Sequence, residues 1–305
     1  MIALLLAVAL DLGLGDPPNR WHPVAWMGRA IGVVRRYSPA GPPWLLVIVG
    51  GASVAGIALA AAGTAALLER LVVGWPLLAV IVEAVLLKCA FSLRALTGAV
   101  TQVRTALAAG DVAGARHALG FHLVSRPTDG LAADAVASGA VESLAENLTD
   151  SWVAPICFYL VGGVPAAWAY RAVNTADAMI GYREGRLEYL GKVPARLDDV
   201  LNFLPARLAA LALVAAARTA GESALGAWRV ARRDGARTAS PNAGRTMAAM
   251  AGALDVTLEK RSHYRLGSGL PPDAAAIDRA LRVARHAVVL TLCAALLSLA
   301  LAIVR

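Results

Sequence analysis

The sequence predicts an all-α, polytopic integral membrane protein with helical loops on the cytoplasmic side. The chain of 305 residues has a mean hydropathy of +0.60, with 58% hydrophobic residues and only 16% charged ones. Soluble domains usually carry about 25% charged residues. Apolar runs of membrane length alternate with arginine-bearing polar segments. The soluble alternative, an Ala-rich helical enzyme, would need amphipathic stripes where this chain has unbroken apolar runs.

Charge and cysteine patterns narrow the class further. The net charge is +8, and the arginines flank the apolar runs, as the positive-inside rule expects. The sequence contains no basic stretch interleaved with aromatic residues, the pattern that would indicate nucleic-acid binding. Cys89, Cys157 and Cys293 each stand alone in apolar sequence, which predicts buried thiols without disulfides. The sequence contains neither H-x-x-x-H nor C-x-x-C, the spacings that would predict a zinc site.

Four apolar segments predict membrane spans within a single membrane-embedded domain, 1–305. The first ends at Asp16-Pro17-Pro18, because proline cannot continue the hydrogen-bond ladder of a helix. The second is rich in Gly and Ala, which let helices approach closely, and Glu69-Arg70 then makes a polar turn. The predicted spans are 1–15, 44–68, 72–93 and 285–304.

Two other apolar segments, 152–173 and 203–220, allow more than one interpretation. A single crossing at 152–173 would export the Arg-rich sequence after it, which the positive-inside rule disfavours. Pro155 and the Gly162–Pro165 break favour a re-entrant or surface hairpin instead, which keeps both polar flanks on one side. The segments expected in the cytoplasm, where the catalytic residues should lie, are 16–40, 94–151, 174–207 and 228–272.

A row of polar side chains follows one side of a predicted helix at steps of four residues: Asp134, Ser138, Glu142, Glu146 and Asp150. Glu142, Glu146 and Asn147 share a face. The two glutamates repel each other, and neither has Lys or Arg four residues away. Magnesium, an arginine from another segment or a ligand ammonium should supply the missing cation. The alternative is a solvated acidic face.

A second group of carboxylates and amides follows further along the chain. Asn174 and Asp177 project together from one predicted helix, and Asp198-Asp199 precede a short helix expected at Val200–Phe203. Such an aspartate pair has an ordinary capping role at a helix N-terminus. With Asn202 it would also suit magnesium, which takes hard oxygen ligands and shares them with substrate phosphates. Both interpretations stay open.

Two loops carry further candidate binding residues. The turn S-P-N-A-G, Ser240 to Gly244, opens a helix beside Arg237, and backbone N–H groups at such a helix start suit a phosphate. The alternative is a simple helix cap. The loop with Asp16 and His22 is either functional or an interfacial belt of Trp and Arg. No Walker A, G-x-G-x-x-G or G-x-S-x-G motif is present.

Six sequence blocks together carry a resemblance to a known family. They are G-D-P-P-N-R-W-H-P-V (15–24), S-R-P-T (125–128), V-E-S-L-A-E-N-L-T-D-S (141–151), Y-R-A-V-N-T-A-D-A-M-I-G-Y-R (170–183), A-R-L-D-D-V-L-N-F-L-P-A-R-L (195–208) and S-P-N-A-G (240–244). In this order they resemble the adenosylcobinamide-phosphate synthase family (CbiB/CobD) of cobalamin biosynthesis, nearly from end to end.

The resemblance implies an ATP-dependent amide ligase. Such an enzyme attaches aminopropanol phosphate, or a related amino alcohol or threonine derivative, to a carboxylate of adenosylcobyric acid and gives adenosylcobinamide phosphate. ATP and Mg²⁺ are the implied cofactors, and the lipid bilayer and other corrinoid-pathway membrane enzymes are expected partners. The alternative class is a non-enzymatic membrane scaffold, sensor or transporter, although a transporter would place more of its polar residues inside the spans.

The candidate site residues fall into three sets. Catalysis is expected of Glu142, Glu146, Asp177, Asp198 and Asp199. Magnesium ligation is expected of Glu146, Asp150, Asp198 and Asp199. Substrate or phosphate binding is expected of Asp16, His22, Arg126, Asn147, Asp150, Asn174, Arg183, Arg207, Arg237, Ser240, Asn242 and Gly244. We expect the acidic groups around 142–150 and 174–199 to face each other at the cytoplasmic rim of a multi-pass cell-membrane protein.

Overall fold

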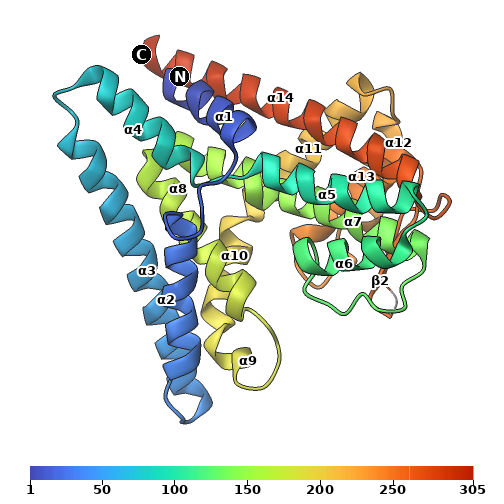
Figure 1. Ribbon diagram of the computed structural model, residues 1–305, viewed down its shortest axis with the longest axis horizontal. Coiled ribbons are helices and arrows are strands. Elements are labelled where there is room, and N and C mark those ends of the chain that lie inside the picture. Colours follow the sequence, from blue (N-terminus) through green and yellow to red (C-terminus); the bar gives the residue numbers. More distant parts are fainter. Residues whose placement is uncertain (261, 305) are drawn as a thin grey trace. The chain divides into compact units, whose positions relative to one another are not determined.

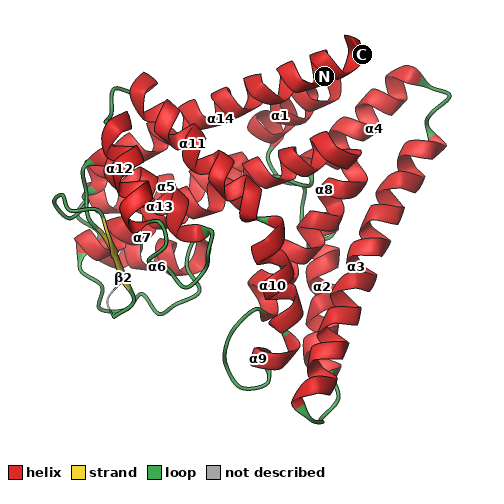
Figure 2. Cartoon of the chain, turned by 180° about the vertical axis from the view of Figure 1, so that it is seen from behind, coloured by secondary structure: helices red, strands yellow, loops and turns green. Residues whose placement is uncertain are grey.

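The computed structural model describes residues 1–260 and 262–304, and most of them are helical (Figure 1). The described residues also include one short antiparallel hairpin, β1 (Leu258–Lys260) with β2 (Tyr264–Leu266). Its second strand is labelled among the red helices of Figure 2. The chain folds into two compact units, each built from segments far apart in the sequence.

The first unit comprises residues 1–92, 154–202 and 295 onward. Its helices are α1 (Ile2–Leu14), α2 (Pro23–Tyr37), α3 (Pro43–Leu71), α4 (Pro76–Lys88), α8 (Ala154–Ile180), α9 (Leu187–Leu190) and α10 (Lys192–Leu201). Their core includes the buried side chains Ile31, Leu46, Val173 and Ile180. A side chain at Gly50 of α3 would place its Cβ 1.8 Å from the Leu190 carbonyl oxygen. Only glycine therefore allows this approach of α3 to α9.

The second unit comprises residues 93–153 and 203–294. Its helices are α5 (Leu93–Ala108), α6 (Val112–His122), α7 (Ala133–Leu148), the π-helical turn η1 (Thr149–Val153), α11 (Phe203–Thr219), α12 (Ala224–Asp234) and α13 (Ala243–Leu254). The last helix, α14 (Ala274–Val304), begins in this unit. Residues 136–145 of α7 and 246–254 of α13 are buried on all sides. Ala and Gly dominate both stretches because neighbouring helices approach closely there.

Four helical stretches are long and apolar enough to cross a membrane: Pro43–Leu71, Pro76–Ala108, Ala133–Ile180 and Ala274–Ala302. The broken pair Lys192–Leu201 and Phe203–Thr219 would make a fifth. These stretches and the predominance of helix confirm the predicted all-α, polytopic membrane fold. Apolar α1 has 13 residues, fewer than the roughly 20 needed to span a bilayer.

Several predicted boundaries can be compared with the helices. The expected break at Gly162–Pro165 is present, because Gly162 and Gly163 in α8 have non-helical backbone angles. Asp111, a residue type typical of helix N-caps, caps α6, since its Oδ1 accepts from the Gly114 N–H at 2.8 Å. The last helix starts earlier than the apolar run at 285, because Asp273 accepts from the Ala276 N–H and caps it. Of the three cysteines, only Cys89 is fully buried.

Candidate functional site

Glu142, in the middle of α7, is a buried carboxylate of the second unit. Its side chain is 6% exposed, and both of its oxygens are occupied. Ser138 Oγ donates to Oε1 at 2.6 Å, and the Tyr264 hydroxyl donates to Oε2 at 2.7 Å. Arg126 Nη2 lies 3.8 Å from Oε2. The cation predicted from the sequence is thus an arginine from another segment, and Glu142 is held as a buried, fully bonded anion.

The hairpin contributes directly to this cluster. The Glu259 N–H donates to Ser138 Oγ at 2.9 Å, and Tyr264 on β2 reaches Glu142. Burial raises the pKa of the Tyr264 phenol well above its ordinary value, and the nearby charges of Glu142 and Glu146 act in the same direction. Tyr264 therefore stays protonated and donates its hydrogen bond at any physiological pH.

The next residues of the row are more accessible. Glu146 is exposed, and Asn147 and Asp150 are partly exposed. Asn147 Nδ2 donates to the Ser143 carbonyl at 2.9 Å, one turn back. Asp150 lies in the π-helical turn η1, a feature that often occurs at functional sites. A ligand from solution can therefore reach Glu146 and Asp150.

The predicted phosphate turn, Ser240 to Gly244, leads into α13 as expected. Thr238 Oγ1 accepts from the Gly244 N–H at 3.1 Å, and Ser240 Oγ accepts from the Asn242 N–H at 3.3 Å. Arg207 on α11 donates to Asn242 Oδ1 at 3.2 Å, and its guanidinium carbon lies 3.3 Å from the centroid of the Phe203 ring. The structure thus joins two predicted phosphate-binding residues, Arg207 and Asn242.

Arg237 has a different setting from the one expected for a phosphate ligand. Its Nη1 lies 3.0 Å from Asp234 Oδ1, and Arg233 Nη2 lies 2.7 Å from Oδ2. Burial alone would raise the pKa of Asp234, but Arg233, the Gly267 N–H and the charge of Arg237 hold it below its ordinary value. Arg237 therefore neutralises a buried carboxylate that ties α12 to the hairpin.

The first unit contains a separate buried network on α8 and α10. Asn174 Nδ2 donates to Asp198 Oδ1 at 3.2 Å, and Asn202 Nδ2 donates to Oδ2 at 3.0 Å. Arg171 donates to Asn174 Oδ1 at 3.0 Å, and the Tyr170 hydroxyl donates to Asn202 Oδ1 at 3.0 Å. The predicted pair Asn174 and Asp198 is thereby brought together.

The expected helix start at Asp198-Asp199 is wrong. Both residues lie in the last turn of α10, which runs from Lys192 to Leu201. Negative charge is unfavourable at the C-terminal end of a helix dipole, so these carboxylates need local partners. The amides described above serve Asp198, and Arg196 lies 3.7 Å from Asp199. Asp177 and Asp199 are partly exposed, and Arg183 is exposed in the loop after α8.

Asp16 and His22 form a third cluster, also in the first unit. Asp16 accepts from Lys88 and, at 2.6 Å, from Ser92 Oγ, and His22 Nε2 lies 3.6 Å from its Oδ1. Lys88 Nζ also lies 3.3 Å from the fully buried Asp11. Burial alone would raise the pKa of Asp16, but hydrogen bonding with His22, Lys88 and Ser92 holds it well below its ordinary value. Asp16 is therefore ionised.

The four predicted magnesium ligands divide between the units, with Glu146 and Asp150 in the second and Asp198 and Asp199 in the first. Across the described part of the chain, no three His, Cys, Asp or Glu side chains form a group that could hold a metal ion. Mg²⁺ commonly takes only one or two protein carboxylates and completes its shell with water and phosphate oxygens. That chemistry fits the accessible Glu146 and Asp150 better than the buried Asp198. The prediction that the two acidic groups face each other stays a prediction.

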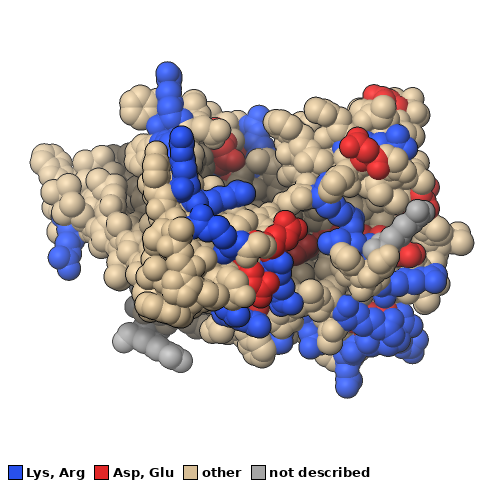
Figure 3. Space-filling model, turned by 90° about the horizontal axis from the view of Figure 1, so that it is seen from below, with Lys and Arg blue, Asp and Glu red and all other residues tan. Residues whose placement is uncertain are grey.

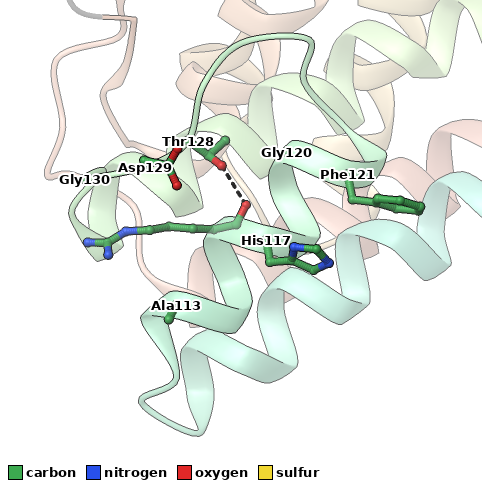
Figure 4. A pocket seen from close by; sticks show the side chains of 8 residues that line it. Ala113, His117, Gly120, Phe121, Thr128, Asp129 and Gly130 are labelled. Atoms are coloured by element: carbon green, nitrogen blue, oxygen red, sulfur yellow. Dashed lines mark hydrogen bonds between the residues drawn. The ribbon is translucent and has the colours of Figure 1, made fainter.

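A further pocket of the second unit, of about 450 Å³, lies between α6 and the segment after it (Figure 4). Thr128 Oγ1 donates to the Arg116 carbonyl at 2.9 Å across its floor. His117 and Phe121 stack with their ring centroids 6.0 Å apart. No predicted site residue lines it.

On the face seen in Figure 3, acidic and basic side chains lie beside one another.

Sequence reasoning missed the site roles of Tyr264 and Lys88. Lys88 stands in an apolar run, as Asp11 does, and two opposite charges in apolar helices must usually pair. That signal could have identified the ion pair. Tyr264 gave no local signal, because the hydroxyl meets Glu142 from 122 residues away.

Comparison with known proteins gives a consistent result. A family model described as CobD/Cbib protein matches residues 4–297. The chain is 44% identical over 273 residues to the cobalamin biosynthesis protein CobD of Dehalococcoides mccartyi, covering 89% of this chain and 88% of that protein. It is 42% identical over 267 residues to the probable cobalamin biosynthesis protein CobD of Methanothermobacter thermautotrophicus, covering 87% and 86% of the two chains. No solved structure matches significantly. The chain therefore belongs to the CobD/Cbib family, in which the relatives named above are cobalamin biosynthesis proteins.

Proposed function

We propose that this membrane protein acts in cobalamin biosynthesis as an ATP-dependent amide ligase. It attaches aminopropanol phosphate, or a related amino alcohol or threonine derivative, to a carboxylate of adenosylcobyric acid, and its active site opens to the cytoplasm. Family membership over nearly the whole chain supports the pathway. The observation that carries the reaction type is the α7 row, in which a buried anion, Glu142, lies behind the accessible carboxylates Glu146 and Asp150.

The reaction determines what the residues must do. A carboxylate is a poor acyl donor, and phosphoryl transfer from Mg²⁺-ATP would turn it into an acyl phosphate with release of ADP. The amine nitrogen then forms the amide bond as the acyl–oxygen bond to phosphate breaks, and one proton passes from the amine to a base. These steps require ligands for Mg²⁺, cations beside the phosphates and one positioned carboxylate.

Separate groups in the second unit meet these requirements. Glu146 and Asp150 would hold the metal ion, because they are accessible carboxylates four residues apart on α7 and η1. Arg207, oriented by Asn242, would bind phosphate oxygens, whereas the N–H groups of Asn242 and Gly244 already donate within the turn. Glu142 would act through Tyr264 and Arg126, which it holds in place, without touching substrate itself.

A single assay tests the ligase proposal. Full-length protein purified in detergent is mixed with adenosylcobyric acid, aminopropanol phosphate and Mg²⁺-ATP, and amide product and ADP are measured by mass spectrometry. We expect product only when all components are present. Glu146→Ala should lower turnover by about 100-fold or more, the scale of a lost catalytic group or metal ligand.

Asp134→Ala is the matched control, because Asp134 is also an exposed carboxylate on α7 but lies three turns away from Glu146. It should leave turnover within about twofold. Folded protein that forms no amide would refute the ligase and favour the scaffold, sensor or transporter class. Near-normal turnover in Glu146→Ala would remove Glu146 from the site.

A further inference from the structure

A pocket of about 380 Å³ in the first unit has no role in the mechanism above. It lies where the segment after α1, the first turns of α2, the residues just after α4 and the C-terminal part of α8 come together. Polar side chains that line it include Asp16, Asn19, His22, Ser92, Arg171 and Thr175. Gly28, Phe91 and Met179 supply apolar wall, so the pocket combines a few polar groups with an apolar body, as small-molecule sites do.

The negative side of the pocket is built rigidly. Asp16 has a side chain 30% exposed and is oriented by Ser92 Oγ, Lys88 and His22. The Val24 N–H donates to His22 Nδ1 at 3.1 Å, so a neutral His22 carries its proton on Nε2, facing Asp16. Lys88 is shared with Asp11. Asp16 therefore presents a fixed carboxylate that can accept a further cationic donor from the pocket.

The positive side comes from Arg171 on α8. Arg171 lines the same pocket, and its Nη1 donates to Asn174 Oδ1, which orients the guanidinium. Asn174 is held in turn by Asp198, so the buried network behind the pocket fixes the arginine. A guanidinium presents its donors in a planar fork that matches phosphate or carboxylate oxygens.

Size and charge together restrict the ligand. The volume is at the low end of the range for drug-sized ligands, which excludes a corrinoid macrocycle with its side chains. The lining charges, one carboxylate and one guanidinium, are a poor match for the several negative charges of ATP. They suit a small molecule that carries one ammonium and one anionic group, provided that each end meets the opposite charge.

We propose that this pocket binds a short aminoalkyl phosphate, with its ammonium on Asp16 and its phosphate on Arg171. Within the proposed function this ligand is the amine substrate, so the assignment of its role rests on that function. This assignment gives Asp16 a definite form of the substrate binding expected of it from the sequence. Asp16 stays ionised to hold the ammonium, and both nitrogens of His22 are engaged. The ammonium gives up one proton before its nitrogen attacks the acyl phosphate and a second as the amide forms, and groups other than Asp16 and His22 accept both.

Calorimetric titration of the full-length protein in detergent tests the assignment with three probes: aminopropanol phosphate, isopropyl phosphate, which lacks the amine, and aminopropanol, which lacks the phosphate. We expect the zwitterion to bind at least about tenfold more tightly than either fragment. Asp16→Asn should remove the advantage over isopropyl phosphate. Arg171→Gln should remove the advantage over aminopropanol.

A steric variant decides the matter even if the charge variants fold poorly. A Cβ at Gly28 would point at Met179 Sδ, 3.4 Å away, so Gly28→Leu should fill the pocket. Gly32→Leu is the matched control, because Gly32 lies one turn further on α2 and a Cβ there meets nothing within 4 Å. We expect Gly28→Leu to weaken zwitterion binding about tenfold and Gly32→Leu to change it less than about twofold.

The two proposals fail in different ways. Zwitterion binding that Gly28→Leu leaves unchanged, or isopropyl phosphate binding equally well, would overturn the pocket assignment even if the protein forms amide. Binding that follows the expected pattern in a protein that forms no amide would keep the pocket and refute the ligase. An unchanged KM for the amine in Gly28→Leu would likewise overturn the pocket.

Discussion

Glu142 and Glu146 are one turn apart on α7, yet they differ in burial. Glu142 is buried and accepts hydrogen bonds from two hydroxyl groups, whereas Glu146 is exposed. Removing a buried, bonded carboxylate leaves its partners without an acceptor in a low-dielectric interior. Glu142 therefore contributes to stability, whereas the exposed Glu146 is the residue to which the proposed function gives a chemical role.

The contrast predicts that alanine substitutions at the two positions lower the stability of the protein by different amounts. Glu142→Ala should destabilise the protein by about 3 kcal/mol, because Tyr264, Ser138 and Arg126 all lose their shared partner. Glu146→Ala should cost less than about 0.5 kcal/mol, as expected for an exposed side chain. Unfolding of both variants in detergent measures the difference. Equal stabilities would show that the Glu142 cluster contributes little to the fold.

Asp16 predicts a pH dependence with a definite sign. Its pKa is lower in the folded protein than in the unfolded chain, so ionised Asp16 stabilises the fold above the ordinary carboxyl pKa of about 3.9. That contribution should be complete at neutral pH and fall as the pH drops below about 4, toward the folded-state pKa. Melting temperatures of the wild type and Asp16→Asn should therefore converge only in acid. A gap that narrows between pH 8 and 5 would contradict this sign.

At the scale of elements, α8 and α10 are joined through Asp198. Two side-chain amides donate to its carboxylate, which offsets the unfavourable position of the charge at the C-terminal end of α10. A hydrogen bond to a charged group contributes roughly 1.5–3 kcal/mol. This pairing holds the end of α10 against α8.

We expect Asp198→Ala to destabilise the protein by about 2–3 kcal/mol, and Asn174→Ala by somewhat less. Because the two side chains share one hydrogen bond, the double variant should be more stable than the sum of the single losses implies, by about 1 kcal/mol. A double-mutant cycle of unfolding in detergent measures this coupling. Strict additivity would mean that the Asn174–Asp198 bond contributes nothing.

The break in α8 depends on backbone conformation. Gly163 has φ 66° and ψ −162°, a region open almost only to glycine. Gly163→Ala should cost about 1–3 kcal/mol. The control is Gly98→Ala in α5, where a Cβ meets nothing within 4 Å and alanine favours the helix by up to about 1 kcal/mol. Comparable melting temperatures for the two variants would show that the break relaxes without strain.

At the scale of the whole molecule, the arrangement of polar segments predicts a topology. If 16–40 and 94–151 are cytoplasmic, the loop between α3 and α4 must lie on the opposite side of the membrane. In a background without native cysteines, Ala109→Cys and Glu184→Cys should react with an impermeant thiol reagent only from the cytoplasmic side. Gly74→Cys should react only from the other side. Labelling of Glu184→Cys from outside would show that 152–173 crosses the membrane once.

Much of this protein could be predicted from local sequence. Hydropathy gave the membrane-length helices, Asp111 marked a helix start, and the glycines of α8 marked a break, because each depends on residues within a few turns. The spacing of the α7 row also showed which carboxylates share a helix face. It could not show which of them is buried.

The sequence by itself therefore determined the membrane class, the presence of long apolar helices and the family to which the six blocks point. Only the tertiary structure decided that Glu142 is enclosed, that Lys88 pairs with Asp16 across 72 residues, and that Asp16 and Arg171 line one pocket. The physical reason is that hydropathy and helix signals sum over neighbouring residues. Burial and charge pairing depend instead on contacts between segments that are distant along the chain.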